Sequence, residues 1–219
     1  MQLVGQLMSR LTPAKTTPRF RVSLPPQQTL DLLTEFYIRE VDRRHLKPQI
    51  DENTQKNLIA VVEALTSEQP KFGIWLYGSV GNGKTTMLYA IMRLIDLLGS
   101  NGFFKYMGEY FSPRVRFKTA TDIVSLRQEN KRDFNDFIEH SIVAIDDVGN
   151  EPKEILEYGN VITPMVDLLM YRYKVQAFTL ITSNLSPSQI KDKYDERVAD
   201  RCREMFAAIK FVNSTYRKK

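Results

Sequence analysis

A glycine-rich stretch combines a lysine with two threonines, and it reads Gly78-Ser79-Val80-Gly81-Asn82-Gly83-Lys84-Thr85-Thr86. Glycines at this spacing let successive backbone N–H groups point at one place, which makes a nest for an anion. The pattern Gly-x-x-x-x-Gly-Lys-Thr is typical of a loop that surrounds the phosphates of a nucleoside triphosphate. There Lys84 reaches the β- and γ-phosphates, and the Thr85 hydroxyl is a ligand of Mg²⁺. We therefore expect residues 78–86 to bind ATP with Mg²⁺.

Two adjacent carboxylates follow an apolar run in Ile142-Val143-Ala144-Ile145-Asp146-Asp147. Ligands of open α/β sheets bind beyond the C-terminal ends of the strands, so a buried strand here would bring both carboxylates to the phosphates. We expect Asp146 to hold Mg²⁺, directly or through water, and Asp147 to orient and polarise the attacking water. Glutamate often has the second role and reaches further, so Glu151 is a candidate assistant. Taken alone, Asp-Asp-Val-Gly is equally a turn that ends a strand.

A second apolar run also ends in polar residues, in Thr179-Leu180-Ile181-Thr182-Ser183-Asn184. If this run is a buried strand, Asn184 emerges at the same edge of the sheet as the two carboxylates. Its amide can then hydrogen-bond the attacking water or a γ-phosphate oxygen. The alternative is that Asn184 caps the helix that Ser186 and Pro187 begin.

An arginine-rich segment follows, with Arg197 and Arg201 four residues apart and so on one face of a helix. An arginine that points outward can reach the γ-phosphate held by a neighbouring subunit, as an arginine finger. The alternative is a set of surface ion pairs with the acidic residues nearby, and this segment alone favours the ion pairs.

Short apolar runs alternate with amphipathic helical patterns over residues 69–219. Strands are expected at 72–77, 115–119, 142–145, 177–182 and 208–212, and helices at 85–98, 121–129, 161–173, from 186 onward, and 196–205. Alternation of this kind predicts a parallel sheet that helices cover on both faces.

The first 68 residues have a different composition. Prolines and basic residues over 1–26 predict a flexible arm, and helical spacing of apolar residues predicts two helices over 27–46 and 52–65. These helices either pack on the main domain, which we favour, or offer a face to a partner. We therefore divide the chain into an arm (1–26), a helical extension (27–68) and an ATPase core (69–219).

Composition narrows the class of protein. A hydrophobic fraction of 42% and a charged fraction of 26% in 219 residues are those of a globular protein with an ordinary core. One cysteine and two histidines exclude an internal disulfide and a structural zinc site. No apolar run has the length of a membrane span and no signal peptide is recognisable, so we expect a cytoplasmic protein that does not contact a membrane.

The net charge of +5 is unevenly distributed. Residues 1–50 carry 8 basic and 4 acidic groups and residues 191–219 carry 9 and 5, whereas the middle of the chain is slightly acidic. Basic ends of this kind slightly favour a polyanionic partner such as nucleic acid over an ordinary solvated surface. Aromatic and basic residues also alternate over Phe103–Lys118, where stacking on DNA bases and ordinary core packing are equally compatible with the pattern.

Together these segments resemble the DnaC-like helicase loaders, a branch of the AAA+ ATPases that also includes the IstB-type transposition helpers. The resemblance covers about residues 70–217 and rests on GSVGNGKTT, IVAIDDVG, TLITSNL, YDERVADRCREM and the terminal NSTYRK. The first two motifs occur in many P-loop enzymes. The TSN strand end followed by the arginine-rich box is much more specific.

The resemblance implies an α/β fold with a three-layer AAA+ core and a parallel five-stranded sheet of order 5-1-4-3-2. By motif position it implies that Asn184 is the sensor 1 residue, that Arg201 is the trans-acting arginine finger and that Arg217 is a second nucleotide-sensing arginine. Because the sequence ends two residues after Arg217, we expect no C-terminal lid domain. The N-terminal extension is shorter than the helicase-binding domain of the family.

The function that the resemblance implies is an ATP hydrolase of DNA replication. Such a helicase-loader-like factor binds DNA, single-stranded in preference to duplex, recognises a replicative helicase or a transposase, and self-associates through Arg201. The main alternative is an IstB-like helper that assembles on duplex DNA. A remote alternative is a small-molecule phosphotransferase, which leaves the TSN strand end and the arginine box without a role. A module that holds ATP without turnover is a further alternative, because the side chain of Asp147 is short.

Overall fold

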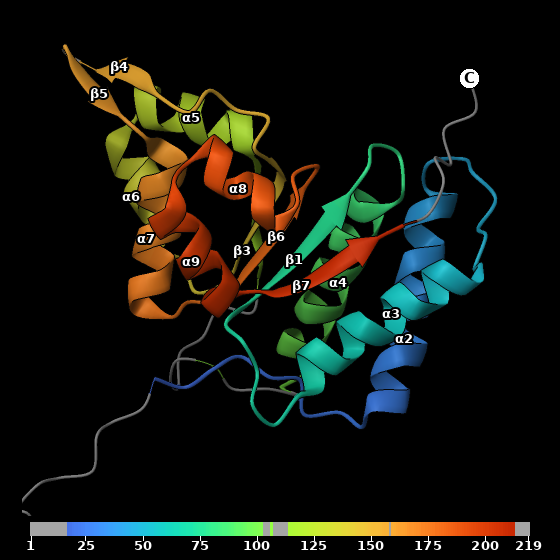
Figure 1. Ribbon diagram of the computed structural model, residues 1–219. Helices are drawn as coiled ribbons and strands as arrows, with labels where there is room; N and C mark the ends of the chain where they lie inside the picture. The colour runs from blue at the N-terminus through green and yellow to red at the C-terminus, as the bar shows by residue number, and fades with distance from the viewer. Residues whose placement is uncertain (1–16, 103–105, 107–113, 158, 213–219) are drawn as a thin grey trace, which may run out of the picture.

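The computed structural model describes residues 17–102, 106, 114–157 and 159–212 of the chain, and its centre is a five-stranded parallel sheet (Figure 1). The strands are β1 Gly73–Gly78, β2 Arg116–Thr119, β3 Val143–Val148, β6 Thr179–Ser183 and β7 Ala207–Phe211. They lie in the order β2-β3-β6-β1-β7. Counted in chain order within this sheet and read from β7, that is 5-1-4-3-2, so the predicted fold is confirmed.

Helices cover both faces of the sheet and make three layers (Figure 1). One face carries α2 Pro26–Asp42, α3 Glu52–Thr66 and α4 Lys84–Ser100; the other carries α5 Ala120–Glu129, α6 Lys131–Glu139, α7 Pro164–Val175, α8 Pro187–Lys193 and α9 Glu196–Met205. Strand β1 serves both cores because successive side chains point to opposite faces: Ile74 and Leu76 join the first core and Trp75 the second. Each face of the sheet is therefore apolar. The polar side chains lie at the C-terminal ends of the strands.

The two N-terminal helices pack onto the core. Leu33 of α2 and Leu58 of α3 are buried in the same apolar cluster as residues of α4 and β7. The chain before them is also held where it is described: Phe20 is buried against the ring of Phe178, and the Val22 N–H donates to the Leu65 carbonyl at 2.8 Å. Residues 17–25 therefore lie against the core and differ from the flexible arm expected over 1–26, of which residues 1–16 lie outside the described part.

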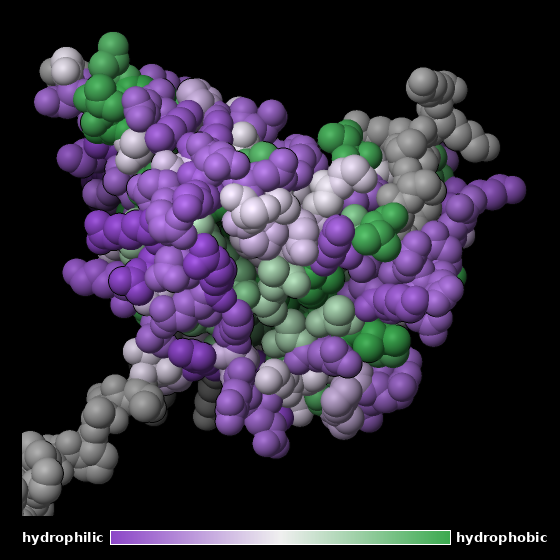
Figure 2. Space-filling view, viewed as in Figure 1, coloured by the Kyte–Doolittle hydropathy of each residue, from purple (hydrophilic) through white to green (hydrophobic). Residues whose placement is uncertain are grey.

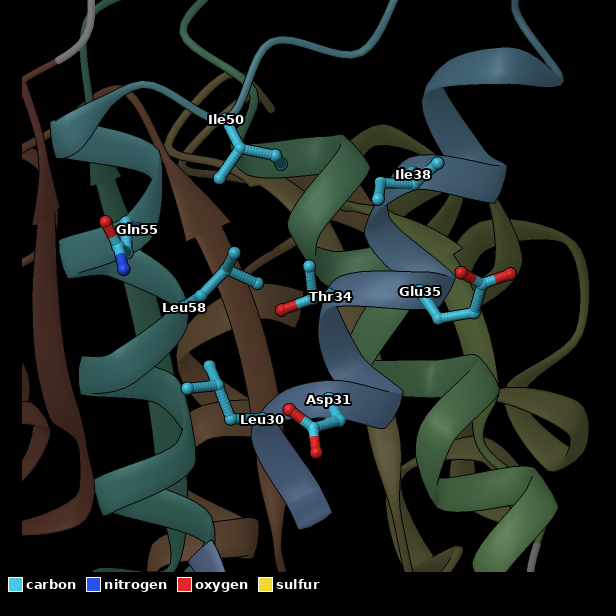
Figure 3. A pocket seen from close by; sticks show the side chains of 8 residues that line it. All are labelled: Leu30, Asp31, Thr34, Glu35, Ile38, Ile50, Gln55 and Leu58. Atoms are coloured by element: carbon cyan, nitrogen blue, oxygen red, sulfur yellow. The ribbon is translucent and has the colours of Figure 1, made fainter. Parts of the chain in front are cut away.

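A shallow groove of about 330 Å³ separates helices α2 and α3 (Figure 3). Leu30, Ile38, Ile50 and Leu58 give it apolar walls, and polar side chains of α2 line part of it. The groove belongs wholly to the helical extension, and none of its residues comes from the glycine-rich loop or from the strand ends.

One helix and one two-stranded hairpin lie between the expected elements and were not predicted. Helix α6 begins after Asn130, whose side chain accepts hydrogen bonds from the backbone N–H groups of Arg132 and Asp133. A small antiparallel hairpin, β4 Ile155–Glu157 and β5 Asn160–Ile162, precedes α7, which begins three residues later than expected.

The hairpin projects from the body of the molecule and carries an exposed apolar patch, visible at the upper left of Figure 2. Leu156 and Val161 face each other across the two strands and are 72% and 60% exposed. Arg127 of α5 holds the hairpin through a two-pronged ion pair with Glu157. A hairpin this short needs such an anchor, because two strands alone are marginally stable in water.

One buried arginine organises the end of the sheet opposite to the strand ends discussed above. The side chain of Arg172 is fully buried, and its guanidinium donates to the carbonyls of Ile138, His140, Ser141 and Phe178. It also donates to the Thr179 hydroxyl at the start of β6. Burial lowers the pKa of Arg172 to about 10, so the group is still charged at neutral pH.

Within the described residues, no helix combines the length and the apolar character that crossing a bilayer requires.

Candidate nucleotide site

The glycine-rich loop joins the end of β1 to the start of α4, the context that a phosphate-binding loop requires. Gly78, Gly81 and Gly83 have φ values of 144°, 84° and 92°, which favour glycine. At Gly78 a Cβ atom would also lie 2.3 Å from the Phe211 carbonyl oxygen of β7. The N-terminus of α4 therefore opens directly onto the loop, where its unpaired N–H groups favour an anion.

Oxygen atoms of the loop and of Asn184 surround the ammonium group of Lys84. Its Nζ donates to the carbonyls of Gly78 and Ser79, each at 2.8 Å, and to the side-chain oxygens of Asn82 and Asn184 at 3.2 and 2.9 Å. The lysine is buried, so its charge is compensated by these oxygens and not by water. The ammonium is thus held at the mouth of the loop, in a position suited to phosphate oxygens.

The Asp146 carboxylate lies beside the loop. One of its oxygens accepts from the Thr85 hydroxyl at 3.0 Å and from the Thr182 hydroxyl of β6. Burial raises the pKa of Asp146 above its ordinary value; the repulsion of Asp147 acts in the same direction, and the two hydroxyl hydrogen bonds oppose it. A carboxylate and a hydroxyl that already meet over the loop form a hard-oxygen pair of the kind that Mg²⁺ prefers.

Asp147 occupies an unusual backbone conformation. The register of β3 against β6 shifts between Ile145 and Val148, so the strand contains one extra residue there, and Asp147 has a φ of 58°. Its N–H donates to the Thr182 hydroxyl at 2.8 Å. A bulge of this kind turns one side chain away from the ordinary alternation. Backbone strain of this sort often marks a functional position, and the extra residue separates the orientations of the two carboxylates.

Asn184 follows β6 directly, and its amide oxygen accepts from Lys84. Its side chain is exposed at the end of the strand. Asn184 does not cap α8: Ser186 does so, with Gln189 completing a reciprocal pair of hydrogen bonds. The structure therefore brings Asn184, Asp146, Thr85 and Lys84 together at one sheet edge.

Arg201 lies elsewhere, on α9. Its guanidinium covers the ring of Tyr173 at 4.7 Å from the centroid and donates to the Tyr173 hydroxyl at 2.9 Å. Glu204 is 3.8 Å away, and the side chain is 40% exposed. None of these partners belongs to the phosphate loop of the same chain. Arg217 lies outside the described residues.

Glu151 and the aromatic stretch 103–118 have surroundings that differ from those expected. Glu151 is buried, and its carboxylate accepts from the Gly149 N–H and from the Tyr194 hydroxyl, so it does not assist Asp147 at the phosphates. In the stretch 103–118, Tyr106 is a core residue, and Phe117 packs against Tyr89 of α4 with 5.2 Å between ring centroids. Residues 103–105 and 107–113 are outside the described part of the chain.

Thr182 was not assigned a role from the sequence, and Asn82 was expected only as part of the phosphate-binding loop. Thr182 bridges Asp146 and the backbone of Asp147. Asn82 is buried, and its amide donates to the Phe211 carbonyl at 3.0 Å while its oxygen accepts from Lys84. The polar strand end Thr-Ser-Asn was a signal for Thr182, whereas the partner of Asn82 depends on the sheet order.

Among the described residues, no group of three His, Cys, Asp or Glu side chains could form an all-protein metal cage. Such a cage is not needed for Mg²⁺, which keeps several waters and binds through one or two protein oxygens plus the phosphates of its nucleotide. Thr85 and Asp146 fit that requirement, because their hydroxyl and carboxylate oxygens are 3.0 Å apart beside the loop.

No family model matches the sequence, and none of the curated proteins does. Solved structures do match. A putative primosome component from Streptococcus pyogenes has a TM-score of 0.58 at 17% identity, over 90% of this chain and 94% of that one. The DnaC helicase loader has a TM-score of 0.55 at 18% identity, over 76% and 94%.

DnaA from Aquifex aeolicus, solved with AMPPCP, has a TM-score of 0.54 at 19% identity. The match covers 77% of this chain but only 50% of the DnaA chain. Identities this low concern the fold and leave the chemistry to the site residues themselves. The chain thus has the AAA+ P-loop fold of the DnaC-like helicase loaders and of the replication initiator DnaA.

Proposed function

We propose that this protein binds and hydrolyses ATP in complex with Mg²⁺. The observation that carries the proposal is the hydrogen-bonded group formed by Lys84, Thr85, Asp146 and Asn184 at the mouth of a glycine-rich loop. A glycine-rich turn with an accidental lysine would not have the residue after β6 hydrogen-bonded to that lysine and a carboxylate of β3 hydrogen-bonded to the next threonine.

The residues divide the chemistry among them. The loop N–H groups and Lys84 bind the phosphates, with Thr86 in the first turn of α4 behind them. Thr85 and Asp146 hold Mg²⁺, which neutralises charge on the β- and γ-phosphates. Asp147 orients and polarises the attacking water, and Asn184 leaves Lys84 to hydrogen-bond that water or the γ-phosphate.

Arg201 is proposed to act on the ATP of a neighbouring subunit. Its present partners, Tyr173 and Glu204, lie on the outer side of α7 and α9, and the side chain is partly exposed. A neighbour's γ-phosphate would replace the weak contact with Glu204, because an exposed ion pair contributes little. Arg217 is proposed to contact nucleotide as well.

The biological role that we favour is that of a helicase-loader-like factor in DNA replication, which binds DNA, single-stranded over duplex, and a replicative helicase. The fold of the DnaC loader and the basic ends of the chain support this role. A transposition helper with a transposase as partner is the second candidate, because it shares the fold and the charge. A comparison of binding to single-stranded and duplex oligonucleotides of equal length separates the two: filaments on duplex alone would favour the helper.

Hydrolysis is tested by following phosphate release from Mg·ATP with purified protein, and binding by equilibrium titration with ATP. Lys84→Ala is expected to abolish both, since it removes the charge that meets the phosphates. Arg203→Ala is a matched control, because Arg203 is an exposed arginine of α9 that pairs with Asp200 and Glu196. ATP that stays bound and intact in the wild type would replace hydrolysis by a binding-only function. Transfer of the γ-phosphate to a nucleoside would support a phosphotransferase.

A further inference from the structure

Glu151 is a buried carboxylate that does not contact the phosphate-binding residues named above. Its side chain is 1% exposed, and a charge at such a depth is retained only when strong donors surround it. One oxygen accepts from the Gly149 N–H at 2.8 Å, and the other accepts from the Tyr194 hydroxyl. The arrangement is therefore specific, with one donor on each carboxylate oxygen.

The two donors come from the two halves of the proposed site. Gly149 lies in the turn directly after Asp147, whereas Tyr194 directly precedes Asp195, the residue that caps α9. Lys193 strengthens the second link, because its ammonium donates to the Glu151 carbonyl at 2.6 Å. Glu151 thus joins the turn that presents Asp147 to the start of the helix that carries Arg201.

The turn itself is fixed on the far side by the end of β6. Gly149 has a φ of 99°, and a Cβ atom there would lie 2.4 Å from the Leu185 side chain. The Ser183 hydroxyl donates to the Val148 carbonyl and accepts from the Leu185 N–H. Residues 147–151 therefore cannot shift without moving either the strand end next to Asn184 or Tyr194.

We propose that Glu151 is a positioning residue that fixes the turn of Asp147 and, through Tyr194, couples it to helix α9. The inference rests on the proposed function, because it gives Asp147 and Arg201 the roles assigned there. In this proposal, phosphates bound in the loop take Lys84 away from Asn184, and the end of β6 shifts as a result. The turn at residues 147–151 transmits that shift, and Glu151 passes it on to Tyr194. Burial, followed by the nearby Glu151 charge, raises the pKa of Tyr194, which keeps the phenol a proton donor.

Tyr194→Phe removes one hydroxyl and leaves the ring in place, so it cuts the link with little change in packing. Glu151→Gln keeps the volume and removes the charge. Tyr106→Phe is the matched control: Tyr106 is equally a buried tyrosine, and its oxygen accepts from the Phe178 N–H at 2.7 Å, at the opposite end of β6. Urea unfolding of each variant establishes that it is folded.

The experiment measures hydrogen exchange of residues 187–205 with and without a non-hydrolysable Mg·ATP analogue, so it requires binding alone. Wild type and Tyr106→Phe are expected to exchange more slowly in α9 when the analogue is bound. In Tyr194→Phe and Glu151→Gln the response is expected to be lost while the Kd of the analogue is unchanged, and hydrolysis per subunit is expected to fall about fivefold or more.

An unchanged α9 response in Tyr194→Phe, or no response in the wild type, would overturn the coupling. Equal loss in Tyr106→Phe would also overturn it, because the effect would then follow from general destabilisation. Failure of the proposed function is a separate result: a wild type that binds the analogue but releases no phosphate rejects hydrolysis, and the exchange data still decide the coupling.

Discussion

Asp147 combines a strained backbone with the chemical task that we propose for it. Its left-handed backbone costs free energy that an ordinary strand residue does not, and only the bulge in β3 and the Thr182 hydrogen bond hold it there. The sequence was enough to predict that Lys84, Thr85, Asp146 and Asn184 lie close together, because each belongs to a motif or follows a strand. The bulge could not be predicted, because it depends on the register between β3 and β6.

Substitutions of Asp147 separate its two properties. Asp147→Asn, which tolerates the left-handed region, is expected to leave ATP binding unchanged and to lower the hydrolysis rate about 100-fold, since the amide cannot polarise water as the carboxylate does. Asp147→Gly is expected to be about 1 kcal/mol more stable than Asp147→Ala, because only glycine lacks the left-handed penalty. Steady-state kinetics and urea unfolding measure these effects. Equal stability of the Gly and Ala variants would contradict the strained backbone.

The raised pKa of Asp146 predicts a pH dependence at the same scale. Because burial raises the folded-state pKa above the unfolded value, ionised Asp146 costs stability, and the stability that its protonated form contributes is lost as pH rises through the raised pKa. Asp146→Asn is therefore expected to stabilise the nucleotide-free protein at neutral pH.

Mg²⁺ reverses the preference, because it needs the carboxylate. The affinity for Mg·ATP is expected to fall as pH drops through the raised pKa of Asp146, and Asp146→Asn is expected to bind Mg·ATP weakly and without that dependence. Titrations with and without EDTA between pH 5 and 8 measure both effects. The role of Asp146 would be contradicted by a wild-type affinity for Mg·ATP that does not change with pH while the affinity for metal-free ATP does.

At the scale of elements, local sequence specified most helices and strands well. Helix α9 was predicted at 196–205 and lies there, because Asp195 caps it and its apolar residues recur at helical spacing. Helix α6 has the same signals, a capping Asn130 and Phe134, Phe137 and Ile138 on one face, so its local sequence is sufficient to predict it. The β4–β5 hairpin was harder, since its anchor is the Arg127–Glu157 pair between distant segments.

Arg172 hydrogen-bonds the segments before β3 and β6, so its substitution tests how much these contacts contribute to stability. Arg172→Met keeps a long side chain but leaves the carbonyls of Ile138 and His140 without their arginine donor, so we expect a loss of about 3 kcal/mol or more in the free energy of unfolding. Arg172→Lys should recover only part of this, because one ammonium cannot reach all the carbonyls. Arg132→Ala, at an exposed position, is the control. A stable Arg172→Met protein would show that the buried charge contributes no net stability.

At the scale of the whole molecule, the parallel sheet brings the residues of the proposed ATP site together at the C-terminal ends of its strands, while α9 carries an arginine that has partners of its own. The order of the sheet followed from the resemblance and not from the propensity of single segments. Contacts between subunits depend on the surfaces of two folded chains, so the local sequence pattern of one chain does not predict them.

Complementation between two inactive variants tests that proposal most directly. Lys84→Ala lacks the phosphate-binding ammonium but keeps Arg201, and Arg201→Ala keeps an intact loop but lacks the arginine. Each alone is expected to hydrolyse ATP at least about 100-fold more slowly than the wild type. An equimolar mixture is expected to regain a substantial part of the wild-type rate as protein concentration rises, because Lys84→Ala subunits supply Arg201 to intact neighbouring loops. A mixture no more active than its parts, or an Arg201→Ala protein as active as the wild type, would contradict the account.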